Sequence, residues 1–434
     1  MRFPGQRKSK HYFPVDKRDP LLCQSTPEAC LEPTHVVGID QTLVDIEALV
    51  DEELLTEYSL SKGHSLVITN DQAERLYEEL RRGDLITQQF AGGTVGNTLH
   101  NYSTLADDNS ILLGVMSREI RIGSYAYRYV CNTSSRVNLE NLQPVDGPVG
   151  RCFALITQDG ERTFAINEGQ MNQLAPDSIP RRVFDGASAL LLTAYLMRCK
   201  PDDPLPAATL RAIGFAREAN VPVVLTLGTK FVIEEDPEFW QGFITDHIDV
   251  LAMNEDEAAA LTGETDPLLA CRSCLQWCDL VLCTAGPLGL YMAGYTDEEV
   301  KRETGHLLLP GAIPEFNRFE FSRPMRRSHC GHPLQVFSFI APYMGGPERI
   351  RNTNGAGDGA LSALLHDMAA NRYHRANLPT SAKHTHEYLS YSSFAQLCKY
   401  ANRVAYEVLA QQAPRLSRGL PHREDSLEEV YWSR

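Results

Sequence analysis

A short glycine-rich stretch at residues 352–358 carries the clearest chemistry in the chain. It reads Asn-Thr-Asn-Gly-Ala-Gly-Asp, and an apolar run typical of a helix begins directly behind it at Gly359. Small residues let backbone N–H groups converge on an anion, and the start of a helix adds partial positive charge. The stretch therefore predicts a phosphate cradle with the carboxylate of Asp358 beside it. A plain turn whose aspartate caps the helix is the alternative.

A second glycine pair, Gly92 and Gly93, precedes another expected helix and is followed by Asn97. Glycines let a ligand approach the backbone, and Asn97 offers both a donor and an acceptor, as a sugar diol requires. No Gly-Lys-Ser/Thr follows, so the stretch is not a Walker loop, and its spacing differs from a dinucleotide fingerprint. A tight turn with an asparagine at the start of a helix is the alternative.

Two aspartates, Asp40 and Asp45, follow the first expected strand. A carboxylate can accept two hydrogen bonds from vicinal hydroxyls. Asp45 stands between Val44 and Ile46, which is an unusual place for a charge without a partner. Both aspartates are therefore candidates to bind a polyol, with a solvated surface position as the alternative for each.

Asn254 and Glu257 lie one turn apart at the start of an expected helix, so their side chains share a face. Mg²⁺ keeps several waters and takes one or two carboxylates together with substrate phosphates. The pair predicts hydrated Mg²⁺ held by Glu257 through water, and the alternative is an N-cap with acidic residues that complement the helix dipole. Thr284, Gly286 and Gly289 form a further glycine turn after a strand.

The elements that position these residues alternate between strands and helices. Near-continuous apolar strands separated by helices predict a parallel sheet covered on both faces, whose loops at the carboxyl ends bind ligands. Residues 151–168 predict a hairpin with Asp-Gly at its turn. Residues 296–345 lack periodicity and predict an insertion of long surface loops, and a charged tail is expected from Pro414. The expected parallel strands lie near residues 189–193, 222–227, 250–253 and 280–284.

Composition limits the classes of function. The net charge of −15, from 41 basic and 56 acidic residues, argues against a nucleic-acid binder. No run of about 18 apolar residues exists, so no membrane span is expected. The basic N-terminus has no apolar segment behind it, which argues against a secretory signal. The 11 scattered cysteines suit a reducing cytoplasm.

Three of the cysteines, Cys271, Cys274 and Cys278, share one face of an expected helix. Their neighbours Leu275 and Trp277 make the helix amphipathic, which favours cysteine as a small core residue. A metal site is the alternative, although no further pair at zinc spacing follows.

A phosphate cradle, a carboxylate, a Mg²⁺-type pair and diol-binding groups together fit transfer of a phosphoryl group to a sugar or polyol. The same motifs resemble those of the ribokinase-like (PfkB) carbohydrate and nucleoside kinase family. Residues 92–97 and 352–358 match its two signatures, and the motifs around Asn254 and Thr284 follow in the expected order. The resemblance covers residues 35 to about 410, apart from the insertion.

The resemblance implies a fold and a division of the chain. The fold is a three-layer α/β sandwich with a mostly parallel central sheet and a small β lid. The lid pieces are expected near residues 43–65 and 118–170. Residues 1–34 are an N-terminal arm, and residues 35–434 form the kinase domain.

Residues 38–46 and 91–93 resemble the nucleoside kinases of the family, and the full pattern is most similar to bacterial members that act on inosine and guanosine. The resemblance implies that MgATP phosphorylates the 5′-hydroxyl of these nucleosides to IMP and GMP in purine salvage. An adenosine or sugar kinase of the same family is an alternative. A non-catalytic regulator that binds nucleoside or ATP is the alternative from a different class, and a homodimer through an unpaired edge of the lid stays open.

The resemblance also implies roles for single residues. Asp358 is the general base, and Arg162, just after the hairpin turn, is the lid arginine that reaches the phosphates. Asn352 stands where the family usually has aspartate, which helps organise a monovalent cation in some relatives, so K⁺ activation is an open question. The remaining roles are an anion hole of Gly355, Ala356 and Gly357, a ribose site of Asp40, Asp45, Gly92, Gly93 and Asn97, and an ATP and Mg²⁺ site of Asn254, Glu257, Thr284, Gly286 and Gly289.

Overall fold

The computed structural model describes residues 34–420, except residues 107, 304–316, 344–346, 348–349 and 418. The expected N-terminal arm therefore lies outside the described residues, apart from Thr34. Within the described part of the chain, no helix is both long enough and apolar enough to cross a membrane.

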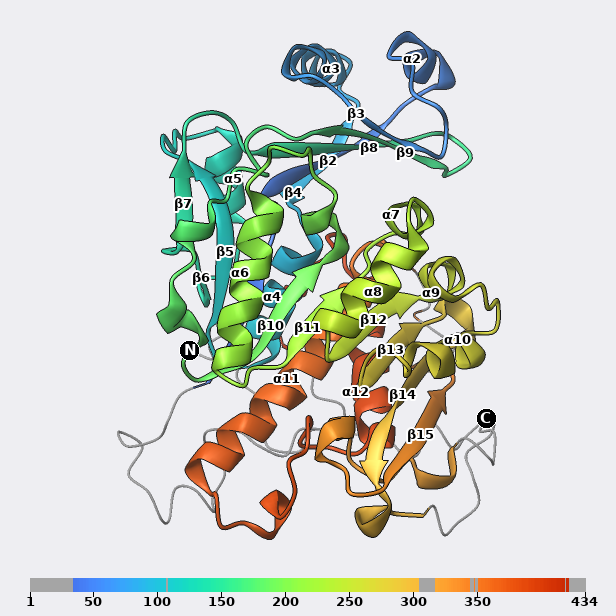
Figure 1. Cartoon of the computed structure of the whole chain (residues 1–434). Helices are drawn as coiled ribbons and strands as arrows, with labels where there is room; N and C mark the ends of the chain where they lie inside the picture. Colours follow the sequence, from blue (N-terminus) through green and yellow to red (C-terminus); the bar gives the residue numbers. More distant parts are fainter. Residues whose placement is uncertain are drawn as a thin grey trace.

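A large, mostly parallel sheet runs through the middle of the molecule (Figure 1). Its order is β15-β14-β13-β12-β11-β10-β1-β5-β6, with β7 also paired to β5. Only β14 and β15, at one edge, run antiparallel to their neighbours in this order. Every residue of β10 is buried, as its continuous apolar run predicts, and the expected parallel sheet is confirmed. The strands are β1 (His35–Ile39), β5 (Ser110–Ser117), β6 (Val137–Asn138), β7 (Leu142–Val145), β10 (Ala187–Thr193), β11 (Val223–Thr226), β12 (Val250–Asn254), β13 (Leu280–Thr284), β14 (Leu290–Asp297) and β15 (Pro333–Ile340).

Helices cover both faces of this sheet and complete three layers. One apolar core joins one face to α4 (Thr94–Leu105), α11 (Ala356–Asn377) and α12 (Phe394–Leu409). A second core joins the other face to α6 (Leu205–Glu218), α8 (Pro237–His247), α9 (Glu255–Thr262) and α10 (Pro267–Cys274). Cys271, Cys274 and Cys278 are buried in this second core, and no group of three or more potential metal ligands occurs among the described residues.

A smaller five-stranded sheet, here called the lid, lies beyond one end of the central strands (Figure 1, top). Its order is β3-β9-β8-β2-β4, and β8 and β9 form an antiparallel hairpin. Helix α3 packs Ala73, Leu76 and Leu80 inwards, as its apolar spacing requires. The lid elements are β2 (Leu43–Leu49), β3 (Ser65–Val67), β4 (Ile86–Ala91), β8 (Gly150–Ile156), β9 (Arg162–Asn167), α2 (Glu52–Glu57) and α3 (Asn70–Arg82).

The range 118–170 divides between the two sheets. Its first part supplies α5 (Tyr125–Cys131) and the strands β6 and β7 beside β5, and only β8 and β9 enter the lid. Strand β4, which the expected lid pieces omitted, completes the lid next to β2.

The expectation of surface loops throughout residues 296–345 is wrong for its regular part. Strand β14 ends inside this range, and β15 pairs along the whole length of β14 as the edge strand of the central sheet. The pairing was missed because a long stretch rich in Pro, Arg and His separates the two strands, and β15 is defined by its pairing with β14 rather than by its own alternation. Residues 304–316 lie outside the described residues.

Candidate active site

A cavity of about 1100 Å³ lies between the lid and the carboxyl ends of the central strands. Ligands bind at this edge in open α/β sheets, because the loops that follow the strands converge there. Most of the expected site residues line the cavity, and only Gly92 and Arg162 do not. The lining includes Asp40, Asp45, Gly93, Asn97, Asn254, Glu257, Thr284, Gly286, Gly289, Gly355, Ala356, Gly357 and Asp358.

The turn before α11 presents backbone N–H groups to this cavity. Gly355 caps the helix with a φ of +78°, and Ala356 and Gly357 are its first residues. The first N–H groups of a helix have no partner within it, and the 22 residues of α11 add a macrodipole. The turn has the properties of an anion hole.

Asp358 lies in the first turn of α11, where its Oδ2 accepts a hydrogen bond of 3.1 Å from Asn97 Nδ2. Desolvation by the surrounding protein raises the pKa of Asp358 to about 7, against the lowering effects of Asn97 and of the Arg415 guanidinium. A general base works best when its pKa lies near the working pH. Asp358 therefore stands beside the start of α11, on the cavity wall, with a pKa near neutral.

Two further carboxylates, Asp40 and Asp45, face the same space, and the glycines of the α4 turn make room for them. A Cβ on Gly93, whose φ is +90°, would lie 2.2 Å from Asp40 Oδ2. A Cβ on Gly92 would lie 2.4 Å from Asp45 Oδ2. Gly92 therefore leaves room for the Asp45 side chain without lining the cavity itself. Desolvation raises the pKa of both aspartates to about 7.

The two aspartates differ in what they already bind. Asp40 accepts backbone N–H groups of Gly96 at 2.6 Å and Gln41 at 2.9 Å, so it orders the turn at the start of α4. Asp45, in β2 of the lid, has the Cys152 thiol on the neighbouring strand β8 as its hydrogen-bond partner among the described residues. Asp45 is thus the better placed of the two to accept hydroxyl groups.

Asn254 and Glu257 form a reciprocal capping box at the start of α9. Asn254 donates to both carboxylate oxygens of Glu257, from its backbone N at 3.0 Å and from Nδ2 at 2.9 Å. Glu257 is only 4% exposed, and desolvation raises its pKa to about 7. The capping alternative therefore describes the local structure, and the carboxylate still faces the cavity.

The lid touches the anion-hole turn through Asn354. Arg162, in β9, donates to Asn354 Oδ1, and Asn354 Nδ2 donates to Glu47 Oε1 at 3.3 Å. Glu47 lies two residues after Asp45, and alternate residues of a strand share a face. Glu47 was not among the expected site residues. Its spacing of two residues from Asp45 in one strand was the signal in the sequence that could have identified it.

The turn after β13 closes another side of the cavity. Gly286 and Gly289 have φ of +45° and +119°, and a Cβ on Gly289 would lie 2.2 Å from the Ile340 carbonyl oxygen. These glycines let the turn pack against the end of β15, with Thr284 on the cavity wall.

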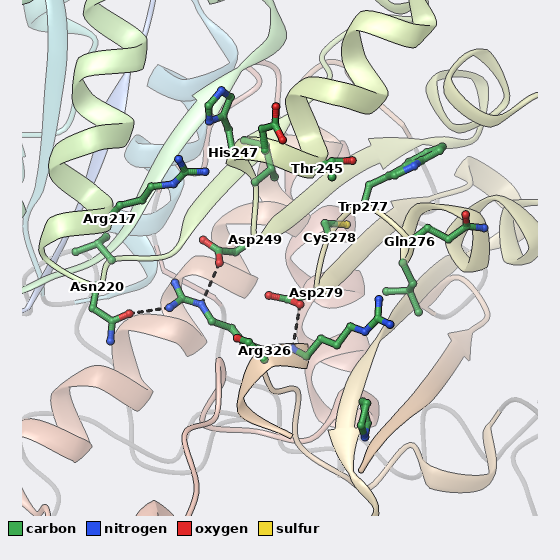
Figure 2. A pocket seen from close by; sticks show the side chains of 17 residues that line it. Arg217, Asn220, Thr245, His247, Asp249, Gln276, Trp277, Cys278, Asp279 and Arg326 are labelled. Atoms are coloured by element: carbon green, nitrogen blue, oxygen red, sulfur yellow. Dashed lines mark hydrogen bonds and ion pairs between the residues drawn. The ribbon is translucent and has the colours of Figure 1, made fainter. Parts of the chain in front are cut away.

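A second hollow of about 640 Å³ lies at the amino ends of β11, β12 and β13, at the opposite end of these strands from the cavity at their carboxyl ends (Figure 2). Several of its polar groups contact one another. Arg326 contacts Asp249 at 3.0 Å and Asn220 at 2.7 Å, and Asp279 accepts the backbone N–H of Arg327 at 2.9 Å.

The chain is similar over its full length to a known enzyme. It is 68% identical over 434 residues to the guanosine-inosine kinase of Escherichia coli (strain K12), with 100% of both chains covered. No family model matches the chain.

Solved structures of kinases share the fold. A probable sugar kinase from Rhizobium etli superposes with a TM-score of 0.66 at 17% identity, covering 89% of this chain and 96% of that one. The adenosine kinase from Sinorhizobium meliloti superposes with a TM-score of 0.63 at 20% identity, covering 89% and 97%. The full-length identity, together with this fold, shows that the chain belongs to the guanosine-inosine kinase family of ribokinase-like kinases.

Proposed function

We propose that the protein transfers the γ-phosphoryl group of ATP to the 5′-hydroxyl of inosine and guanosine, giving IMP and GMP. The observation that carries the proposal is the full-length identity of 68% to a guanosine-inosine kinase. The geometry supports it, because a carboxylate base, an anion hole and diol-binding groups line one cavity. Such a reaction belongs to purine salvage in the cytoplasm, and the nine cysteines of the described residues, all unpaired, suit that compartment.

Asp358 acts as the general base in this proposal. It accepts the proton of the 5′-hydroxyl as the oxygen attacks the γ-phosphorus. In a loose transition state little proton transfer is needed before bond formation, so holding the hydroxyl in line matters more. Asp45 and the start of α4 hold the ribose, which fixes the distance between its 5′-oxygen and Asp358.

The amides of Gly355, Ala356 and Gly357 stabilise the charge that develops on the transferred group. Such preorganised donors are worth about 10²–10³-fold in rate each when water is excluded. In this proposal the closed lid excludes water, and its Arg162 and Glu47 side chains contact Asn354 of the turn. We expect Arg162, which is not among the residues that line the cavity, to reach the phosphates only when ATP is bound.

The residues at the start of α9 fit a hydrated Mg²⁺. Glu257 is a buried carboxylate on the cavity wall, and each of its oxygens keeps a lone pair beyond the hydrogen bonds from Asn254. Fewer than three potential ligands gather there among the described residues, which fits binding through water and ATP rather than a protein cage. When bound, Mg²⁺ neutralises charge on the ATP phosphates.

We expect the enzyme to work without K⁺, and the hydrogen bonds of Asn352 support this expectation. Its Nδ2 donates to the Gln412 carbonyl at 2.9 Å, and its Oδ1 accepts the N–H of Asn354 at 2.9 Å. The neutral amide thus ties the two segments together by hydrogen bonds, where an aspartate beside the same carbonyl would need a cation between them.

The test is an ATP-dependent phosphorylation panel of inosine, guanosine, adenosine, ribose and fructose, run in K⁺ and in Na⁺ buffers. Inosine and guanosine are expected to be the preferred acceptors, with less than a twofold difference between the two cations. Phosphorylation of free sugars alone would contradict the nucleoside assignment. ATP binding without turnover of any acceptor would favour the regulator.

A further inference from the structure

The segment that follows α12 is built into the active site. Residues 412–416 pack between the anion-hole turn and α4. Leu416 N donates to Asn101 Oδ1 at 2.7 Å, and a Cβ on Gly355 would lie 2.4 Å from the Pro414 carbonyl oxygen. With the Asn352 bond to Gln412, these contacts fix the segment on both sides.

Arg415, in the charged tail expected from Pro414, is only 6% exposed. Its Nε donates to Asn97 Oδ1 at 2.8 Å, and its Nη1 donates to the Asn132 carbonyl at 2.9 Å. Its Nη2 is buried without a hydrogen-bond partner among the described residues. A buried guanidinium with an unused donor is costly unless nearby negative charge compensates it.

That negative charge comes from the substrate site. The carboxylates of Asp40, Asp45 and Asp358 all interact electrostatically with Arg415. Across the cavity, the charge of Asp358 contributes to the raised pKa of Glu257, on α9. Arg415 is the cation common to the three aspartates.

Arg415 also determines which way the Asn97 amide points. A guanidinium can only donate, so the Asn97 atom that faces it is the oxygen. The amide nitrogen must then face Asp358, 3.1 Å away, and donate to its carboxylate. A donor at this place favours the ionised form of Asp358, which is the form that can accept a proton.

Resting on the proposed function, we propose that Arg415 is a positioning residue: through Asn97 it keeps the base Asp358 ionised and oriented. No phosphate or nucleoside contact of Arg415 is needed for this role. The pH dependence of kcat tests this role, because a residue that only stabilises the fold would not change the pKa of the base.

The experiment compares the pH dependence of kcat for the wild type and for Arg415→Gln, with inosine and MgATP saturating. Loss of the charge and of the amide orientation raises the pKa of Asp358. The acid limb of the profile should therefore move up by about one pH unit or more, and kcat below the limb should fall about tenfold or more. The deficit should shrink towards pH 9.

Arg415→Lys keeps the charge and should recover part of the shift. Arg323→Gln is the matched control, because Arg323 donates in the same way to Asn371 Oδ1 at 2.9 Å and to the Ser390 carbonyl at 3.1 Å, away from the cavity. It should lose stability without moving the limb.

An unmoved acid limb in Arg415→Gln, or the same shift in Arg323→Gln, overturns the role of Arg415. If Arg415→Gln fails to fold, Arg415→Lys becomes the test. An acid limb at a higher pH than in the wild type supports the proposal. An acid limb and a kcat equal to those of the wild type overturn it. Wild-type protein that phosphorylates no nucleoside overturns the proposed function itself, which keeps the two failures apart.

Discussion

The two hollows of this molecule lie at opposite ends of the same strands and differ in how their carboxylates are paired. At the amino ends, Arg326 and Asp249 pair within 3.0 Å, and Asp279 is satisfied by a backbone N–H (Figure 2). At the carboxyl ends, Asp45, Asp358 and Glu257 line one cavity without a direct salt bridge among the described residues. Asp249 at the amino ends has a direct ion-pair partner, whereas these three carboxylates at the carboxyl ends have none among the described residues.

The difference separates structural charge from functional charge. Carboxylates that are desolvated without an ion pair cost stability, and their raised pKa reports that cost. Such groups gather at sites that bind or transform a ligand. The predictions that follow test whether the two ends differ in this way.

The largest effect is expected from Asp358→Asn. Loss of the base should lower kcat by about 10²–10⁴-fold while nucleoside binding persists. In the wild type, the pKa of about 7 means that Asp358 is protonated below pH 7, so kcat should fall on the acid side of that pH. Steady-state kinetics from pH 5 to 9, with nucleoside binding by calorimetry, measure both. Near-wild-type turnover by the variant would remove Asp358 from the role of base.

The same variant should be more stable than the wild type at pH 8. The folded pKa of Asp358 lies above its unfolded value of about 3.9. The folded state therefore binds more protons between the two values, and wild-type stability falls as the pH rises from about 4 to 7. In denaturant unfolding, the variant should gain more free energy of unfolding over the wild type at pH 8 than at pH 5. An equal gain at both pH values would contradict a raised pKa of Asp358 in the folded state.

An intermediate effect is expected from Gly355→Ala. The new Cβ meets the Pro414 carbonyl and a φ of +78°, so the free energy of unfolding should fall by about 1–3 kcal/mol, with a loss of kcat. Gly357→Ala is the matched control, because a Cβ there has no neighbour within 4 Å. Equal loss of stability in both variants would show that the turn is not held by the 412–416 segment.

The smallest effect on activity is expected from Arg326→Gln in the second hollow. The variant breaks the contact with Asp249, and its stability should fall by about 1 kcal/mol, as for a partly exposed ion pair. The kcat/KM for inosine should change less than twofold, because the cavity lies at the other end of the strands. A larger kinetic change would show that the two ends are coupled.

Much of the fold and many of the candidate site residues followed from local patterns in the sequence. The glycine turns at residues 92–93 and 355–357 were visible because backbone approach requires small residues at fixed places. The expected strands near residues 250–253 and 280–284 are confirmed as β12 and β13. These features depend on neighbours in the chain, which periodicity and turn chemistry report.

The missed residues depend on contacts that no local pattern records. Arg415 donates to Asn97 across 318 positions of sequence, and the sequence around it predicted only a charged tail. Cys152 contacts Asp45 only through the register of β2 and β8. Strand β15 was hidden because its pairing partner, and not its own alternation, defines it.

Strand β1 belongs to the body and β2 to the lid, and only residues 40–42 separate them. The polar groups of the proposed nucleoside site are thus divided between the two parts: Asp358 and Asn97 stand on the body, and Asp45 on the lid. We expect a nucleoside that binds both parts to draw the lid shut, so that its apparent affinity includes the free energy of closing. Any substitution that shifts the open–closed equilibrium of the lid should therefore change the KM for nucleoside, even where it touches no ligand.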